Sequence, residues 1–169
     1  MQIIPLTGSH DRQGFDCGKP ALNDWLCQIA RQHQDKGLSN TFVAVLEDDP
    51  KRIYGYYALT LTEVDRHHLP AAYRKKLPKR IPGIRLGRLA VDQHYQGKRL
   101  GELLLMDVLV RAQRIHQEAG VVGLFVDALD EQAAAFYRHF GFTAAPDNPL
   151  MLFLPVASIS IKQNNLGEK

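Results

Sequence analysis

Residues 88–101 read Arg88-Leu-Ala-Val-Asp-Gln-His-Tyr-Gln-Gly-Lys-Arg-Leu-Gly101. An apolar, strand-like start leads into a turn with glycine and two cations, and an apolar stripe at helical spacing follows to residue 119. The free N–H groups of such a turn and the positive end of a helix favour an anion, above all a phosphate. Lys98 and Arg99 add formal charge beside them. The stretch predicts a strand–loop–helix unit that holds phosphate, although turns of this kind also serve as plain connections.

The rest of the chain alternates strand-like and helix-like patterns around this unit. Helices are predicted at 20–36, 101–119 and 131–140, the last capped by Asp130, with a short one near 71–76. Strands are predicted at 3–6, 41–46, 53–61, 84–91, 121–126 and 150–154. This order, a run of strands and then alternating strands and helices, indicates one mixed α/β (α+β) domain over 1–155 with a C-terminal tail at 156–169.

The composition argues against a disulfide-rich secreted protein and against a membrane-spanning one. The chain has 169 residues, of which 45% are hydrophobic and 23% charged, as in an ordinary globular domain. Two cysteines do not make a disulfide scaffold, the first residues do not resemble a secretory signal, and no apolar run reaches the roughly 20 residues that span a bilayer. We therefore expect a cytoplasmic protein without a membrane segment.

Basic residues are concentrated in one segment. Residues 66–91 hold eight of the 21 lysines and arginines and none of the 18 acidic residues, so the remainder carries a net charge of −5. Such a surface on an acidic body attracts polyanions. The alternative interpretation is a solvated loop, since prolines stand at 70, 78 and 82.

Two motifs resemble the GNAT family of acetyl-CoA-dependent N-acetyltransferases. Residues 96–101, Gln-Gly-Lys-Arg-Leu-Gly, match the family's Gln/Arg-x-x-Gly-x-Gly/Ala signature at both ends, with Arg99 at the usual place of its middle glycine. A non-glycine residue fits there if its φ is negative. Residues 135–142, Ala-Phe-Tyr-Arg-His-Phe-Gly-Phe, match the helix and Gly-Phe pair that form the family's second mark. The resemblance implies a mostly antiparallel central sheet flanked by helices, with acetyl-CoA bound between central strands.

Further stretches resemble one branch of the family, the GNAT toxins of type II toxin–antitoxin modules. They are residues 15–18, 41–44, 55–59, 86–91 and 149–155, so the resemblance covers most of the chain. It implies acetylation of the α-amino group of aminoacyl-tRNA, which blocks translation. It also implies a homodimer and a cognate ribbon-helix-helix antitoxin. The toxin would contact operator DNA only through this antitoxin.

The resemblance assigns site residues. Tyr137 stands at the family's general-acid position, and a phenol with a pKa near ~10 stays protonated at neutral pH. By itself Tyr137 would be interpreted as a core tyrosine. The acetyl-CoA site would comprise Leu89, Ala90, Val91, Gln96, Gly97, Lys98, Arg99, Leu100, Gly101 and Phe136. The tRNA-binding residues would be Arg74, Lys75, Lys76, Lys79, Arg80 and Arg85.

Other chemistry is not indicated. The histidines show no metal-ligand spacing, so no metal is expected, and no glutamate or histidine stands out as a general base. An α-amine, with a pKa of about 8, is partly neutral at pH 7 without one. Two alternatives remain. The chain could acetylate a small amine or a protein N-terminus, or it could be a scaffold that binds acetyl-CoA or nucleic acid without turnover.

Overall fold

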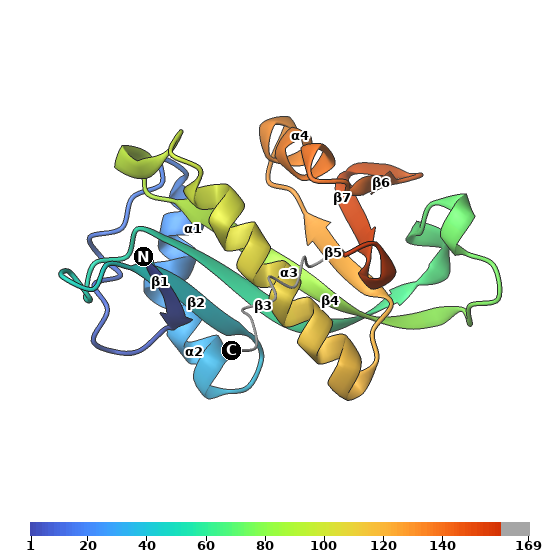
Figure 1. Cartoon of the computed structure of the whole chain (residues 1–169), viewed down its shortest axis with the longest axis horizontal. Coiled ribbons are helices and arrows are strands. Elements are labelled where there is room, and N and C mark those ends of the chain that lie inside the picture. Colours follow the sequence, from blue (N-terminus) through green and yellow to red (C-terminus); the bar gives the residue numbers. More distant parts are fainter. Residues whose placement is uncertain (160–169) are drawn as a thin grey trace, which may run out of the picture.

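The computed structural model describes residues 1–159, which form one seven-stranded sheet in the order β1-β2-β3-β4-β5-β7-β6 (Figure 1). The strands are β1 (Gln2–Pro5), β2 (Asn40–Val45), β3 (Gly55–Asp65), β4 (Arg80–Val91), β5 (Gly123–Asp127), β6 (Thr143–Ala145) and β7 (Asn148–Pro155). Only β4 and β5 run parallel, and the other neighbours are antiparallel. The mixed, mostly antiparallel sheet implied by the family resemblance is confirmed.

Helices cover both faces of the sheet. On one face lie α3 (Leu100–Ala119) and α4 (Glu131–His139), which share a core with inward side chains of β3, β4, β5 and β7. On the other face α1 (Pro20–Asp24), a π-helical turn (Trp25–Ile29) and α2 (Ala30–Asp35) form one continuous segment against β2 and β3. Figure 1 shows α3 crossing the sheet opposite α1 and α2. Among residues 1–159, no helix is both long enough and apolar enough to cross a membrane.

The helix termini follow from local sequence. The sheet-facing stripe of α3 consists of Leu104, Leu105, Val108 and Ala112, all fully buried, and Gly120 ends the helix at a φ of 72°. Asp130 caps α4, because its side chain accepts a hydrogen bond from the Ala133 N–H at 2.9 Å.

A wedge opens between the two parallel strands. β4 pairs with β5 only over Ile84–Leu86, although β4 continues to Val91. Gly87 forms a bulge at the point where pairing stops, because Leu86 and Arg88 oppose consecutive residues of β3. Beyond the bulge β4 diverges from β5, and this divergence creates the space for a site.

Several boundaries differ from the predicted ones: the helix at 20–36 contains a π-helical turn, the short helix near 71–76 is a 3-10 turn at Ala71–Tyr73, and β5 begins at Gly123. β6 was not predicted, and β3 and β4 extend further into the segment that joins them, to Asp65 and from Arg80. The packed domain also extends past residue 155, because Val156 and Ile159 are buried in the core beside α3. The remainder of the predicted tail, residues 160–169, lies outside the described residues.

Candidate active site

A cleft of about 650 Å³ occupies the wedge between β4 and β5. It reaches from the loop before α3, past α4, to the start of α1. Its walls include seven of the eleven residues that the sequence assigned to acetyl-CoA and catalysis. These are Leu89, Ala90, Val91, Gln96, Gly101, Phe136 and Tyr137. Leu100 is not part of the lining, because its side chain packs in the core.

The backbone of β4 has a free edge in the cleft. The Asp92 N–H donates to the Tyr54 carbonyl at 2.9 Å, which fixes the alternation of hydrogen-bonding groups along β4. It follows that the N–H and C=O groups of Leu89 and Val91 point away from β3, into the wedge. β5 no longer pairs with β4 there, so the N–H and C=O of Leu89 and the N–H of Val91 are available to the amides of an extended, pantetheine-like chain. The Val91 carbonyl already accepts a hydrogen bond from Gln96 Nε2.

Gln96 holds the loop before α3 against the end of β4. Its amide Nε2 donates to the Val91 carbonyl at 2.9 Å and to the Cys17 carbonyl at 3.0 Å. Gly97 has a φ of 76°, and a Cβ there would meet no atom within 4 Å, so the space beside the loop is open.

Arg99 has a left-handed backbone. Its φ is 63° and its ψ is 17°, so the negative φ that would suit a non-glycine residue is not adopted. The loop keeps the geometry that its usual glycine permits, and the arginine bears the strain, which is of the order of 1–2 kcal/mol. Arg99 is also the N-cap of α3 and provides no side-chain cap.

The N-terminus of α3 and its loop suit a pyrophosphate. Among residues 1–159 no side chain caps this 20-residue helix, which leaves its first N–H groups for an anion. Lys98 adds a cation, and its Nζ lies 5.0 Å from the centre of the Tyr95 ring. With the free edge of β4, this is a donor set and a shape that acetyl-CoA fits.

Tyr137 lines the cleft from α4. The side chain is 5% exposed and packs edge-to-face against Phe136 and Phe142. Its hydroxyl forms no hydrogen bond to another described residue. Burial raises the pKa of Tyr137 well above its ordinary value, so the phenol carries its proton throughout the neutral range.

The cleft offers no evident general base. Among the described residues that line it, the titratable carboxylates are Asp127 and Asp130, and each is paired with a cation. Asp130 Oδ2 lies 3.1 Å from Lys19 Nζ, and Asp127 pairs with Arg85. An amine that reacts here would have to arrive neutral, as an α-amine partly does near pH 7.

The basic segment is an anchored lobe at the far end of the β3–β4 hairpin (Figure 1). Leu69 and Ile81 are fully buried and pack with Phe125 and Phe153, so the segment is more than a solvated loop. Five of the six residues assigned to tRNA lie on this lobe, which we define as residues 66–80. They are Arg74, Lys75, Lys76, Lys79 and Arg80.

The six cations differ in their freedom to bind a phosphate. Arg80 Nε lies 3.0 Å from Glu63 Oε1, and Arg74 Nε donates to the Leu69 carbonyl at 2.7 Å. Arg85 lies farther along β4, where Asp127 partners it at the rim of the cleft. Within residues 1–159, the exposed Lys75, Lys76 and Lys79 form no ion pair. The three lysines are therefore the cations of the lobe that are freest to bind phosphate.

Three possible metal ligands come together at the base of the lobe. Ligand atoms of His67, His68 and Asp147 lie within 4.8 Å of one another, a proximity that sequence spacing could not indicate. Each histidine already has a carboxylate neighbour, His67 at 2.7 Å from Asp65 and His68 at 3.6 Å from Asp147. Histidine–carboxylate pairing explains the cluster, and the expectation of no metal stays a prediction.

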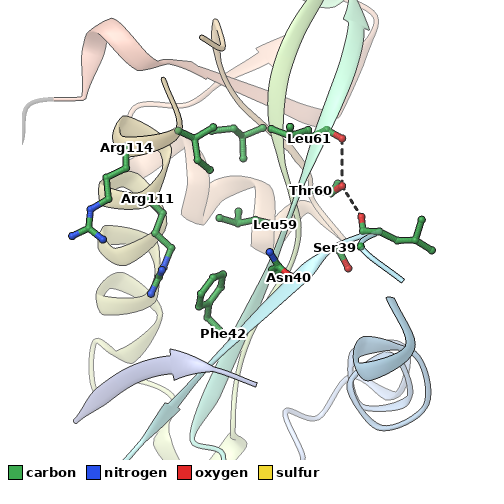
Figure 2. A pocket seen from close by; sticks show the side chains of 12 residues that line it. Ser39, Asn40, Phe42, Leu59, Thr60, Leu61, Arg111 and Arg114 are labelled. Atoms are coloured by element: carbon green, nitrogen blue, oxygen red, sulfur yellow. Dashed lines mark hydrogen bonds between the residues drawn. The ribbon is translucent and has the colours of Figure 1, made fainter. Parts of the chain in front are cut away.

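A second cavity, of about 620 Å³, lies on the opposite flank of α3 (Figure 2). Arg111 stands over the Phe42 ring at 3.8 Å and donates to the Tyr57 hydroxyl at 2.6 Å and to Asp107 at 3.0 Å. Thr60, across the cavity, donates to the Leu38 carbonyl at 2.7 Å. Its lining includes neither the loop before α3 nor Tyr137, so we do not place the chemistry there.

Sequence reasoning missed one wall of the cleft. Cys17 and Lys19 precede α1 and Leu22 lies in it, whereas Asp127 ends β5 and Asp130 caps α4. No spacing in the sequence indicates that residues 17–22 meet residues 127–130. Only the Lys19–Asp130 pair in the folded chain reveals it.

Comparison with known proteins agrees with this geometry. Residues 38–144 match the model of the acetyltransferase (GNAT) domain family, which is more than half of the chain. The chain belongs to the GNAT acetyltransferase family. Its resemblance to that family, inferred from the motifs at 96–101 and 135–142, is confirmed.

Individual relatives are more specific. The chain is 36% identical over 149 residues to a tRNA-acetylating toxin of Mycobacterium tuberculosis (strain ATCC 25618 / H37Rv), covering 88% of each chain. It is similar to a structure of AtaT complexed with acetyl-methionyl-tRNAfMet, with a TM-score of 0.85, 35% identity, and 93% of this chain and 95% of that one covered. It is also similar to an AtaT mutant bound to the C-terminus of the antitoxin AtaR and acetyl-CoA, with a TM-score of 0.76, 33% identity, and 93% and 94% covered. This GNAT chain thus resembles the toxin branch that its motifs indicated.

Proposed function

We propose that this GNAT chain is a toxin that transfers the acetyl group of acetyl-CoA to the α-amino group of aminoacyl-tRNA and so blocks translation. The observation that carries the proposal is the position of Tyr137, a buried tyrosine that lines the cleft beside the part of β4 that does not pair with β5. Relatives over nearly the whole chain that are named as tRNA-acetylating toxins, or hold acetylated tRNA, support the choice of substrate.

Each part of the cleft has one task in this reaction. The loop at 96–101 and the first N–H groups of α3 bind the pyrophosphate, and the free groups of Leu89 and Val91 hold the pantetheine arm and orient the acetyl carbonyl. Acetyl-CoA supplies the thioester. Tyr137 donates its proton to the sulfur as the carbon–sulfur bond breaks, and the proton released by the acetylated amine restores the phenol.

Two properties favour aminoacyl-tRNA as the acceptor: the low pKa of its α-amine and the negative charge of its phosphates. A lysine ε-amine, with a pKa of about 10.4, needs a base to become neutral, whereas an α-amine with a pKa of about 8 does not. The cleft has no such free base among its described residues, which favours the α-amine. The basic lobe favours a polyanionic carrier over a free polyamine, and tRNA phosphates are such a carrier.

Partners follow from the same resemblance. We infer that a cognate antitoxin with a ribbon-helix-helix half inhibits the chain, that operator DNA is reached only through this antitoxin, and that the chain acts as a cytoplasmic homodimer. An AtaT structure that holds the C-terminus of the antitoxin AtaR supports the antitoxin. The dimer, the cytoplasmic location and the fold of the antitoxin rest on the family resemblance alone.

A panel of acceptors tests the proposal. The chain is incubated with radiolabelled acetyl-CoA and, separately, aminoacyl-tRNA, deacylated tRNA, spermidine and a peptide with a free N-terminus. We expect label on the aminoacyl-tRNA alone. Label on spermidine or the peptide alone would establish the small-amine alternative. Binding of acetyl-CoA without transfer to any acceptor would establish the scaffold alternative.

A further inference from the structure

Arg88 carries the one uncompensated charge among the described residues that line the cleft. Four charged side chains line it, those of Lys19, Arg88, Asp127 and Asp130. Lys19 pairs with Asp130, and Asp127 pairs with Arg85 from outside the lining. Within residues 1–159, Arg88 has no carboxylate partner. A lone guanidinium in a cleft whose other charges are paired favours an anionic ligand.

Arg88 faces the α1 side of the sheet. The bulge at Gly87 sets the alternation of β4, so that Ala90 packs with the α1 segment while Leu89 and Val91 pack on the α3 side. In keeping with this, the Arg88 guanidinium stands over the Trp25 ring at 5.1 Å. The loop at 96–101 leads instead into α3. Arg88 therefore lies on the side of the wedge away from α3, where an acceptor can approach the free edge of β4.

The Arg88 guanidinium is fixed in place by two contacts, but most of its N–H donors have no partner among the described residues. Nη1 donates to the Gly87 carbonyl at 2.8 Å, and the Trp25 ring supports one face. This is the single hydrogen bond that the Arg88 side chain forms to another described residue. Since a guanidinium has five N–H donors in a planar fork, most of them remain for a ligand, and a phosphate or a carboxylate can accept two parallel bonds from this fork.

We propose that Arg88 is a positioning residue that binds the phosphate on the 5′ side of the 3′-terminal nucleotide of the substrate. This rests on the function proposed above. In aminoacyl-tRNA that phosphate is the backbone charge nearest to the esterified amino acid. Arg88 directly precedes Leu89, whose free backbone groups face the reacting centre. Contact at Arg88 would therefore fix the α-amine relative to the acetyl carbonyl, while the basic lobe binds phosphates farther along the tRNA.

Three acceptors that differ in phosphate content test this role. They are aminoacyl-tRNA, aminoacyl-cytidylyl-adenosine, which retains the phosphate in question, and aminoacyl-adenosine, which lacks it. For Arg88→Met, whose side chain keeps an apolar stem over Trp25, we expect kcat/KM to fall about 10- to 100-fold with the two phosphate-bearing acceptors. With aminoacyl-adenosine we expect a change of less than about twofold, and we expect the acetyl-CoA dissociation constant to remain unchanged.

Two further variants complete the design. Arg88→Lys keeps the charge but loses the fork, and we expect a smaller fall than for Arg88→Met, again confined to the phosphate-bearing acceptors. This variant also serves if Arg88→Met does not fold. Arg114→Met removes an exposed arginine from the second cavity and should leave all three acceptors unaffected.

The outcomes separate this inference from the proposed function. An equal fall with all three acceptors, or no fall with any, would overturn the role of Arg88. If the unmodified chain acetylated none of the three acceptors, the proposed function itself would fail, and the inference with it. If wild-type kcat/KM were equal for the two small acceptors, their phosphate would make no contact and Arg88 could not hold it.

Discussion

The side-chain amide of Gln96 donates a hydrogen bond to the Val91 carbonyl across 2.9 Å, which ties the loop before α3 to the last residue of β4. A second bond from the same nitrogen, to the Cys17 carbonyl at 3.0 Å, brings the segment before α1 to the same point. Three stretches far apart in the sequence therefore meet at one amide. Because both partners are acceptors, only a donor can occupy this position.

Replacing that donor by a carboxylate tests the loop. We expect Gln96→Glu to weaken acetyl-CoA binding by more than about tenfold, because a carboxylate would face two carbonyls and repel the pyrophosphate. Isothermal titration calorimetry with acetyl-CoA measures the change. Gln28→Glu, an identical substitution at an exposed position of the α1 segment, serves as the matched control. Equal affinities for the two variants would show that Gln96 does not shape the loop.

Arg99 offers a test of stored backbone strain. Its φ of 63° is one that glycine adopts freely and that arginine does not. We expect Arg99→Gly to be more stable towards urea than Arg99→Ala by about 1 kcal/mol, even though glycine loses more backbone entropy on folding. If the guanidinium also supports the phosphates of acetyl-CoA, both variants should bind it more weakly, and most clearly at low salt. Equal stabilities would contradict the left-handed assignment.

The free lysines of the basic lobe should govern tRNA affinity. We expect Lys75→Gln/Lys76→Gln and Lys79→Gln to weaken tRNA binding and to reduce the log–log salt slope by about 0.7–0.9 per lost contact. Arg80→Gln should have less effect, since Arg80 already has Glu63 as a partner. Acetyl-CoA affinity should not change. A salt slope unaltered in the lysine variants would mean that tRNA binds another surface.

Acid should loosen the turn that begins the lobe. The His67 backbone N–H and then its side chain lower the pKa of Asp65 from an ordinary 3.8 to about 2. A depressed pKa means that Asp65 stabilises the turn above about pH 4 and loses this effect as the pH falls towards 2. Hydrogen exchange at His67 and His68 should rise over that range, and Asp65→Asn should remove the dependence. A pH profile shared by both proteins would contradict this assignment.

Local patterns predicted most of the fold. The stripe from Leu104 to Ala112 and the cap at Asp130 depend on neighbours in sequence, so α3 and α4 were predictable to within a residue. β6 was not, because three residues are too few for a pattern to emerge. Val156 and Ile159 were assigned to the tail because their burial depends on contacts with α3, which no local rule describes.

The residues of the site also fall into those that local sequence predicted and those that it did not. The loop at 96–101 and Tyr137 came from contiguous motifs, whereas the Lys19–Asp130 pair and the partners of Arg80 and Arg85 join residues distant in sequence. Counting charges could not show that two of the six expected tRNA contacts are already ion-paired. Nor could it show that Arg99 keeps the backbone of the glycine that it replaces.

Mass spectrometry of the 3′-terminal fragment of aminoacyl-tRNA, after incubation with the chain and acetyl-CoA, tests the central claim most directly. We predict one added acetyl group on the α-amine. We also predict a rate loss of about 10²–10⁴-fold for Tyr137→Phe, with acetyl-CoA affinity preserved. An aminoacyl-tRNA that leaves the reaction unmodified, or Tyr137→Phe turning over within a few-fold of the unmodified chain, would contradict the account.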